Sequence, residues 1–348
     1  MSYTNGLDKP SDYFNTKLYT GTGSELSISS LDFSPDWVWV KQRGADASHF
    51  LYDSVRGATK SIRSNSTNAE ATVAQSLKSF DSNGFTLGTS AEPNTSSGTY
   101  VGWNWKANGA GSANTDGSIN STVSANTTSG FSIVNYTGTG SNATIGHGLG
   151  AVPKMFIARN ITDAEQWTTY HVGLDATAPQ NYHVRLNTND ARIDEAAVWN
   201  DTAPTSSVFS VGSSGAPNGN GDNHIAYCFA DVQGYSKFGS YTGNGNSDGP
   251  MIVTGMKPAW LMIKKSSATE EWYMYDNKRT PFNEIAKGLA ANLSGAEFDT
   301  GATIDFLSNG FKNTGTNTGT NASGATYIYM AFAENPFVTS TGVPATAR

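Results

Sequence analysis

Aspartate and arginine recur at the same spacing in two distant parts of the chain, as Asp53 with Arg56 and as Asp276 with Arg279. Most glycoside hydrolases use two carboxylates that flank the scissile bond. An active-site carboxylate is rarely duplicated within one chain, whereas an arginine three residues after an aspartate can pair with it and fix a turn. We therefore interpret both pairs as structural ion pairs.

Histidines and acidic loops could hold a metal ion. Four of the five histidines lie in or near the middle third of the chain, but their spacing matches no ligand motif. The run from Asn218 to Asp222 resembles the start of an EF-hand loop, yet its twelfth position falls on Phe229, which cannot bind calcium. We predict no metal site from these residues. The sequence leaves open whether calcium binds in another Asp- or Asn-rich loop.

Exposed tryptophans would indicate glycan binding, because the indole face can stack on a sugar ring. Trp199 lies in a polar stretch and is the best candidate for a surface contact; the alternative is that it plugs a loop. Trp167 and Trp272 are two further candidates, since they align with His49 and not with a third large apolar residue.

Signatures of catalysis are otherwise missing from the sequence. It contains no Walker loop, no G-x-S-x-G elbow, no H-E-x-x-H run and no paired-cysteine site. We expect a protein without enzymatic activity and without a cofactor.

The segments that carry these residues recur three times. A tyrosine followed by a glycine-rich turn stands at Tyr19, Tyr136 and Tyr241. A proline that opens an apolar run follows each of them, and a second tyrosine follows each proline at a constant distance. These prolines and tyrosines are Pro35, Pro153 and Pro258, and Tyr52, Tyr170 and Tyr275. The period has the size of a small domain, which indicates three tandem copies of one domain.

The run after each proline is apolar on both faces, at residues 37–40, 155–158 and 260–263. A strand with one solvent-exposed face would alternate apolar and polar residues. We therefore predict a central strand that the opposing sheet covers on one face. The other face would be covered by an insert, the next copy or another subunit. Large apolar residues replace one another at these positions, which favours a core role for Trp37, Trp103 and Trp105.

Short apolar runs bounded by Gly, Asn and Pro predict an all-β protein. We expect three tandem antiparallel β-sandwich repeats of the jelly-roll or lectin-like type, with short helical or irregular inserts. The best helix candidate is Pro281–Leu293. The predicted segments are repeats at 1–108, 131–234 and 235–335, a linker or long surface loop at 109–130 rich in Gly, Ser, Asn and Thr, and a tail at 336–348.

Composition excludes several classes of partner. The net charge is −7, only 15% of residues are charged and no basic stripe is present, so we expect no nucleic-acid binding. No run is long and apolar enough to predict membrane insertion, and the first residues do not resemble a cleaved secretory signal. A single cysteine, Cys228, excludes an intrachain disulfide.

Four runs in the first copy carry a family resemblance. They are residues 37–41, 51–57, 82–85 and 100–106, and residues 114–118 and 146–150 extend it. These runs resemble a repeat domain of unknown function found in virion proteins of tailed, often marine, bacteriophages. The resemblance is close over most of the first 160 residues and looser beyond them.

The resemblance implies a structural protein on the virion surface, as a tail fibre, a spike or a head decoration, assembled in the cytoplasm of the bacterial host. Its expected partners are capsid or tail proteins and copies of itself, with a homotrimer favoured by the resemblance. A lectin-like adhesin that binds host-surface glycans is the alternative. A depolymerase that cuts surface polysaccharide is less favoured, because no unrepeated cluster of acids is present.

Overall fold

The computed structural model describes residues 6–346. For residues 300–303 it describes the backbone but not the side chains. The chain is all-β, with 43% of residues in strands and 7% in helices, and its sheets are antiparallel. Residues 1–5 of the predicted first repeat and residues 347–348 of the predicted tail lie outside the described residues.

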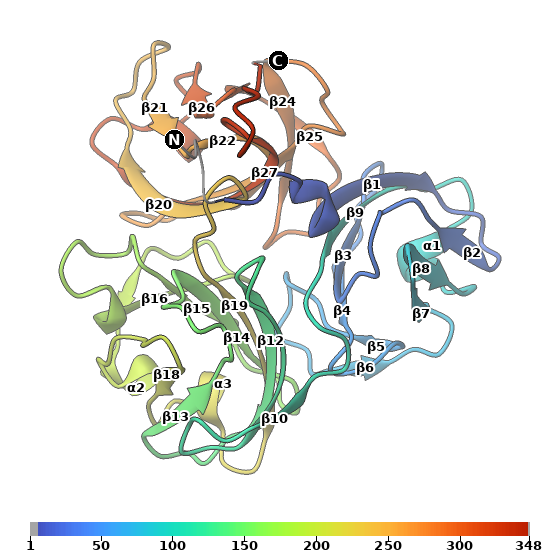
Figure 1. Cartoon of the computed structure of the whole chain (residues 1–348), viewed down its shortest axis with the longest axis vertical. Helices are drawn as coiled ribbons and strands as arrows, with labels where there is room; N and C mark the ends of the chain where they lie inside the picture. Colours follow the sequence, from blue (N-terminus) through green and yellow to red (C-terminus); the bar gives the residue numbers. More distant parts are fainter. Residues whose placement is uncertain (1–5, 347–348) are drawn as a thin grey trace.

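Three lobes surround a common centre (Figure 1). In lobe 1, a sheet in the order β1 (Phe14–Thr20), β9 (Thr99–Trp105), β3 (Trp37–Gln42), β4 (His49–Asp53) packs on a second sheet, β2 (Leu26–Ile28), β8 (Gly84–Leu87), β7 (Leu77–Asp81). A two-stranded ribbon, β5 (Lys60–Ser61) with β6 (Ala71–Thr72), lies beyond β4.

Lobes 2 and 3 repeat the central order of lobe 1. The sheet of lobe 2 runs β10 (Ser112–Asn114), β11 (Ser121–Asn126), β12 (Phe131–Thr137), β19 (Asn223–Phe229), β14 (Met155–Asn160), β15 (Thr168–His171), β16 (Tyr182–Arg185), β17 (Ile193–Asp194), beside the pair β13 (Ala143–Gly146) and β18 (Val208–Val211). The sheet of lobe 3 runs β20 (Ser236–Thr242), β27 (Thr326–Pro336), β22 (Met256–Lys265), β23 (Trp272–Asp276), β24 (Ile285–Ala290), β25 (Phe298–Leu307), β26 (Gly310–Asn313), β21 (Met251–Val253). One sheet of the chain curls into a nearly closed barrel.

Strand register is the same in the three lobes. The first tyrosine of each copy lies opposite an aromatic residue of the closing strand, in the pairs Tyr19–Tyr100, Tyr136–His224 and Tyr241–Tyr327. The second tyrosine lies opposite the second residue of each apolar run, in the pairs Val38–Tyr52, Phe156–Tyr170 and Leu261–Tyr275. The repeated spacing in the sequence therefore corresponds to a repeated place in the sheet.

The prolines differ in one lobe. β3 and β14 begin two residues after Pro35 and Pro153, but β22 begins before Pro258. Its pairing with β27 shifts register on both sides of Pro258, since proline has no N–H to donate and a bulge accommodates it.

The glycine-rich turn that follows each first tyrosine closes on a buried asparagine. In lobe 1, Oδ1 of Asn94 accepts the backbone N–H of Thr22 at 2.8 Å, and its Nδ2 donates to the carbonyl of Gly88 at 2.7 Å. The hydroxyl of Tyr19 donates to the carbonyl of Pro93 at 2.7 Å. Asn218 and Asn321 make the equivalent contacts in the other lobes. The turn motif and the asparagine thus form one structural unit.

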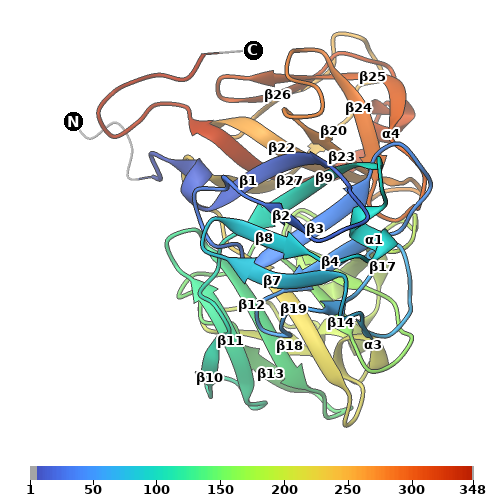
Figure 2. The same cartoon turned by 90° about the vertical axis from the view of Figure 1, so that its right-hand side faces the viewer.

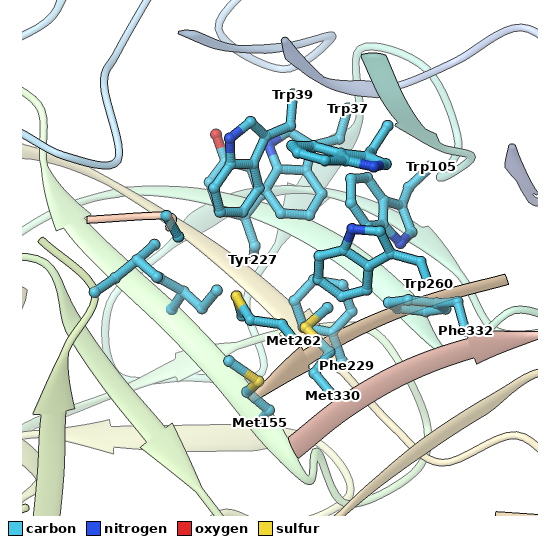
Figure 3. Close-up of a cluster of buried hydrophobic side chains, with 14 of the residues drawn as sticks. Trp37, Trp39, Trp105, Met155, Tyr227, Phe229, Trp260, Met262, Met330 and Phe332 are labelled. Carbon is cyan, nitrogen blue, oxygen red and sulfur yellow. The ribbon is translucent and has the colours of Figure 1, made fainter. Parts of the chain in front are cut away.

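A shared core fills the centre between the lobes (Figure 3). Trp37 of lobe 1 stacks on Tyr227 of lobe 2, with ring centroids 4.4 Å apart. Trp105 of lobe 1 meets Trp260 of lobe 3 edge-on at 5.6 Å. Phe229 of lobe 2 and Phe332 of lobe 3 are 6.1 Å apart. Every lobe therefore contacts both of the others through aromatic rings.

The second face of each central strand packs within its own lobe. Val38 and Val40 belong to the core of lobe 1, Phe156 and Ala158 to that of lobe 2, and Leu261 and Ile263 to that of lobe 3. This arrangement explains why the runs after the prolines are apolar on both faces. Of the covers that the sequence leaves open, the structure uses the other copies of the same chain.

Two sequence-based predictions need correction. Residues 109–130 are not a bare connection, because they contain β10 and β11, which extend the sheet of lobe 2 beyond β12. Residues 281–293 contain no helix but include β24, since apolar residues four apart lie on one face of a strand as well as on one face of a helix.

The helices that do form are single turns, α1 (Ala91–Asn94), α2 (Ala196–Trp199), α3 (Gly215–Asn218) and α4 (Thr318–Asn321), with two 3₁₀ turns, η1 (Pro10–Asp12) and η2 (Pro179–Asn181).

The two ends of the described chain lie together on one side of the molecule (Figure 2). The backbone N–H of Ser340 donates to the carboxylate of Asp8 at 2.7 Å. The N–H of Leu7 donates to the carbonyl of Gln233, which lies just before lobe 3. Leu7 and Asp8 therefore contact the segments just before and just after lobe 3.

Replacement of Trp39 by alanine tests the shared core. Trp39 is fully buried there, and we expect Trp39→Ala to lower the free energy of unfolding by roughly 3–5 kcal/mol through lost burial and a residual cavity. Chemical denaturation followed by tryptophan fluorescence and circular dichroism measures the change. Phe282→Ala is the control, since Phe282 is 73% exposed and should be nearly silent. Equal stability of the two variants would contradict the assignment of the core.

Candidate functional site: polar contacts between the lobes

One side chain at an equivalent position of each lobe donates a hydrogen bond to the backbone of the next lobe. Trp167 Nε1 donates to the carbonyl of Arg63 at 2.9 Å, and Trp272 Nε1 donates to that of Arg185 at 3.0 Å. In lobe 1 the position is His49, whose Nε2 lies 3.0 Å from the carbonyl of Ala290. The three contacts run from lobe 2 to lobe 1, from lobe 3 to lobe 2 and from lobe 1 to lobe 3, so they close a ring.

His49 can act as a donor because its other nitrogen is occupied. The indole N–H of Trp39 donates to His49 Nδ1 at 2.8 Å, which leaves the proton on Nε2. Burial lowers the pKa of His49 well below its usual value, so the ring is neutral at pH 7. His49 therefore makes the same kind of contact as the two tryptophans that align with it.

The backbone N–H of each of these residues is held by an asparagine. The three pairs are His49 with Asn65 at 3.0 Å, Trp167 with Asn187 at 2.9 Å and Trp272 with Asn292 at 3.0 Å. Each acceptor carbonyl lies two residues before one of these asparagines. The same loop therefore accepts the hydrogen bond from the neighbouring lobe and orients the donor residue of its own lobe.

A second ring consists of buried cations. Lys41, Arg159 and Lys264 occupy equivalent places in the central strands and are fully buried. Lys41 Nζ donates to the carbonyl of Ser294 at 3.0 Å, and Lys264 Nζ donates to that of Asn189 at 3.3 Å. Arg159 Nη2 donates to the carbonyl of Asn68 at 2.6 Å. Each cation therefore donates to the same loop of the neighbouring lobe that accepts the hydrogen bond from the indole or imidazole of its own lobe.

Burial determines the ionisation of these cations. It lowers the pKa of Lys41 and of Lys264 to about 8, and the pKa of Arg159 to about 10. All three groups are therefore mainly charged at pH 7, and backbone carbonyls of a neighbouring lobe are among the acceptors of each.

A third ring is formed by the backbone alone. The three bonds are Glu70 N–H to the carbonyl of Ile161 at 3.0 Å, Arg192 N–H to that of Ser266 at 2.9 Å, and Glu297 N–H to that of Arg43 at 2.7 Å. They run in the opposite direction around the molecule, from lobe 1 to lobe 2, from lobe 2 to lobe 3 and from lobe 3 to lobe 1. Each junction is thus held from both sides.

Both ion pairs indicated by the sequence are present and buried. Arg56 Nε lies 2.5 Å from Asp53 Oδ2, and Arg279 Nε lies 2.5 Å from Asp276 Oδ2. In each pair the other carboxylate oxygen accepts the backbone N–H of the arginine at 2.8 Å, which fixes the turn. Each arginine also reaches a glutamate, Glu70 at 3.2 Å or Glu297 at 3.3 Å.

The aspartates also take part in contacts between lobes, which sequence reasoning did not find. Tyr227 of lobe 2 donates its hydroxyl to Asp53 at 2.7 Å, and Trp103 of lobe 1 donates its indole N–H to Asp276 at 3.1 Å. Burial disfavours the charge of Arg56. The interactions with Asp53, Tyr227 and Glu70 outweigh this effect and raise the pKa of the arginine.

In lobe 2, the aspartate and the arginine are both replaced, and the donor that would come from the neighbouring lobe is replaced as well. His171 stands where the other lobes have aspartate, and Leu174 stands where they have arginine. In lobe 3, the position equivalent to Trp103 and Tyr227 is Met330, whose side chain has no N–H or O–H to donate. His171 instead bonds the backbone of lobe 3, with Nε2 3.0 Å from the carbonyl of Tyr329, while its Nδ1 accepts the N–H of Gly173 at 2.9 Å. A carboxylate at this position would have neither the arginine nor the side-chain donor from the neighbouring lobe that Asp53 and Asp276 have.

The tryptophans predicted as surface contacts are not exposed. Trp199 is 1% exposed, because the single turn α2 directs it inward, where it meets Phe156 edge-on at 4.8 Å. Trp167 and Trp272 are 0% and 1% exposed and belong to the first ring of contacts. The prediction of exposed tryptophans is therefore wrong, and the polar residues around Trp199 in the sequence belong to the turns that flank it.

The acidic loop and the histidines are used in other ways. Asp222 accepts a hydrogen bond from Asn160 at 2.9 Å, and His224 stacks on Tyr136 at 5.1 Å. Within residues 6–346, no three His, Cys, Asp or Glu side chains gather in a way that could hold a metal ion.

Replacement of Asp53 by asparagine tests the polar contacts. Asp53→Asn keeps the size of the side chain but leaves the buried charge of Arg56 without its closest counter-charge. We expect a loss of roughly 3–5 kcal/mol in the free energy of unfolding, measured by denaturant titration. Asp248→Asn should have little effect, because Asp248 pairs with Lys312 at the surface and is 84% exposed. Equal effects of the two substitutions would show that the buried pair does not stabilise the fold.

The stability of the protein should fall in acid partly through His171. Burial lowers the pKa of His171 to about 4 from an ordinary value of 6.5, so between these pH values the unfolded chain binds a proton that the folded chain does not. Stability is therefore present above pH 6.5 and is lost as the pH falls toward 4. His171→Gln removes this titration. We expect the wild type to lose about 3 kcal/mol more than the variant between pH 7 and pH 4, measured by denaturant titration at each pH. Parallel pH profiles would contradict the assignment.

Comparison with known proteins gives one family match. No curated protein matches the chain. Within residues 6–346, none of the helices has the length and apolar character of a membrane-spanning helix. A family described as "Domain of unknown function (DUF7483)" matches residues 9–336, a range that includes all three lobes. The chain belongs to this family.

Proposed function

We propose that the chain is a non-enzymatic structural component on the surface of a tailed-phage virion, as a tail fibre, a spike or a head decoration. The observation that carries this proposal is that buried polar side chains of the chain connect its lobes. Buried ionisable side chains at the lobe junctions, among them Asp53, Lys41 and His171, bind a neighbouring lobe. The identity of the particle rests on the resemblance of residues 37–41, 51–57, 82–85 and 100–106.

Rigidity is the property that such contacts provide. A buried catalytic acid or base must exchange its proton during turnover. Burial instead holds His49 and His171 neutral, and the lysines are fixed by carbonyls. A closed unit of three lobes suits a module displayed outside a particle, where chaperones cannot refold it.

Partners follow from the same proposal. Six of the seven large apolar residues that are exposed among the described residues lie between Met251 and Val343, in lobe 3 and the segment after it. The concentration of exposed apolar side chains in this part of the chain favours it as the part that contacts other proteins. We propose capsid or tail proteins as partners and assembly in the host cytoplasm. A homotrimer remains the preferred oligomer from the resemblance, although one chain already supplies three lobes about one axis.

Labelling of intact particles tests the proposal. An antibody against the recombinant chain, coupled to gold, is applied to gradient-purified particles of the phage that encodes the chain. We expect gold on the fibres, spikes or head surface, and peptides of the chain in the particle fraction by mass spectrometry. Antibody adsorbed beforehand with the recombinant chain is the control. Recovery of the chain only in the soluble part of the lysate would refute the proposal.

A further inference from the structure

One strand of lobe 3 has a free edge. β21 stands at the end of its sheet and, of the described strands, pairs with β26 alone. It lies on the outer side of the lobe, away from the centre that the three lobes share (Figure 1). Met251 and Val253 are 50% and 62% exposed, whereas Ile252 between them is buried. The edge therefore presents two large apolar side chains to solvent.

The strand register shows which backbone groups of β21 are unused. Val253 lies opposite Gly310, and the bond next to this pair runs from the N–H of Thr254 to the carbonyl of Asn309 at 2.9 Å. In an antiparallel ladder this places Val253, and Met251 two residues before it, at positions that do not bond the facing strand. Their N–H and C=O groups point away from β26, and within the described residues none of these four groups has a hydrogen-bond partner.

The other lobes contain the same strand with different residues at the edge. Each of the three strands has an isoleucine opposite a phenylalanine, in the pairs Ile28–Phe85, Ile145–Phe209 and Ile252–Phe311. The residues on either side of the isoleucine are Ser27 and Ser29 in lobe 1, Thr144 and Gly146 in lobe 2, and Met251 and Val253 in lobe 3. The apolar edge is therefore a property of lobe 3 and not of the repeat.

In lobe 2, a segment of the same chain covers this edge. The N–H of Ile119 donates to the carbonyl of Thr144 at 3.0 Å, and the N–H of Thr144 donates to the hydroxyl of Ser118 at 2.9 Å. Ile119 forms a parallel bridge with Ile145 and joins it in the core of lobe 2. A short extended segment, residues 118–121, thus bonds the groups that β21 leaves unused and adds an apolar side chain to the core.

Lobe 3 has no comparable segment of its own. Residues 118–121 belong to the long stretch between β9, which ends at Trp105, and β12, which begins at Phe131. Before lobe 3, β19 ends at Phe229 and β20 already begins at Ser236. A free edge is a template for pairing with another chain, and proteins usually cover it or make it polar. Lobe 2 covers its edge and lobe 1 has exposed serines there, whereas lobe 3 has neither protection.

The surroundings of the edge favour an uncharged, apolar occupant. β21 carries no charged residue. Lys312 lies opposite Met251 on the neighbouring strand, and it is already paired with Asp248 at 2.5 Å. A charge brought beside β21 would therefore find no free counter-charge on Lys312, whereas apolar side chains would cover Met251 and Val253.

We propose that the free edge of β21 binds a short, uncharged, extended segment of another protein. The backbone of this segment bonds Met251 and Val253, its apolar side chains cover them, and it adds a strand to the sheet of lobe 3 in the direction that residues 118–121 take beside β13. For the identity of the partner we rest on the proposed function, which names capsid or tail proteins, whereas the binding edge itself does not depend on it.

Fluorescence anisotropy with a fluorescein-labelled peptide tests the edge on the full chain. The probe has the sequence of residues 117–123 with valine in place of Ser118 and Asn120, because residues 118–121 cover the equivalent edge in lobe 2. We expect the wild type to bind it with a Kd below about 1 mM, and the double variant Met251→Ser, Val253→Ser to bind about tenfold more weakly or less. The serines copy the edge of lobe 1, so we expect the variant to fold, and circular dichroism checks this.

Two controls define the binding mode. Phe282→Ser removes an apolar side chain that is 73% exposed but lies outside β21, so its affinity for the probe should equal that of the wild type. A second probe with proline in place of Ile119 lacks the N–H that the carbonyl of Met251 would accept, and it should bind about tenfold more weakly or less.

Three outcomes would overturn the proposal. They are no binding of the first probe to the wild type, equal binding to the double serine variant, and a dimer of the free chain in sedimentation velocity that the serine variant abolishes. In the last case a second copy of the chain, and not another protein, would occupy the edge. Absence of the chain from phage particles would refute the proposed function and leave binding of the probe unchanged.

Discussion

The fold depends on one constraint, which is that each lobe contains a strand with two apolar faces and can cover only one of them. β3, β14 and β22 bury one face in their own lobe and the other against the remaining two lobes. A single lobe would expose a row of tryptophans, methionines or phenylalanines to water. The lobes therefore behave as parts of one hydrophobic core, and a unit of three is the smallest that closes.

Apolar packing alone would not fix how the lobes are rotated about the centre, because it is largely non-directional. The three rings of hydrogen bonds supply this orientation. Two of them run one way around the molecule and the third runs the other way, so a rotation of one lobe would break contacts at both of its junctions. Buried cations bonded to carbonyls add little net stability compared with an apolar substitute, but they penalise any arrangement in which the charge has no partner.

Much of this architecture could be predicted from residues and spacing. The all-β class followed from short apolar runs, and the apolar pattern of Trp37–Val40 indicated burial on both faces. The Asp53–Arg56 and Asp276–Arg279 pairs followed from a spacing of three. Other features were not accessible, because they depend on which residues far apart in the sequence meet in the fold. Trp199 sits among polar neighbours in the sequence, and only the packing of α2 on Phe156 shows that it is buried. The strands within 109–130 consist mostly of small polar residues, and only the pairing of β10 with β11 and of β11 with β12 makes them strands.

At one junction, His171, Leu174 and Met330 replace the aspartate, the arginine and the donor found at the other two. This replacement affects how such a molecule can vary. In an assembly of three identical subunits, one mutation alters every contact about the axis together, and a pair of partners must remain compatible three times over. In a single chain, each junction can change independently. The three lobes are then no longer interchangeable, so their order around the axis is encoded in the side chains as well as in the covalent connections. A lobe that took the place of a different lobe would meet partners that do not match its own side chains, which disfavours any other order of the lobes around the axis.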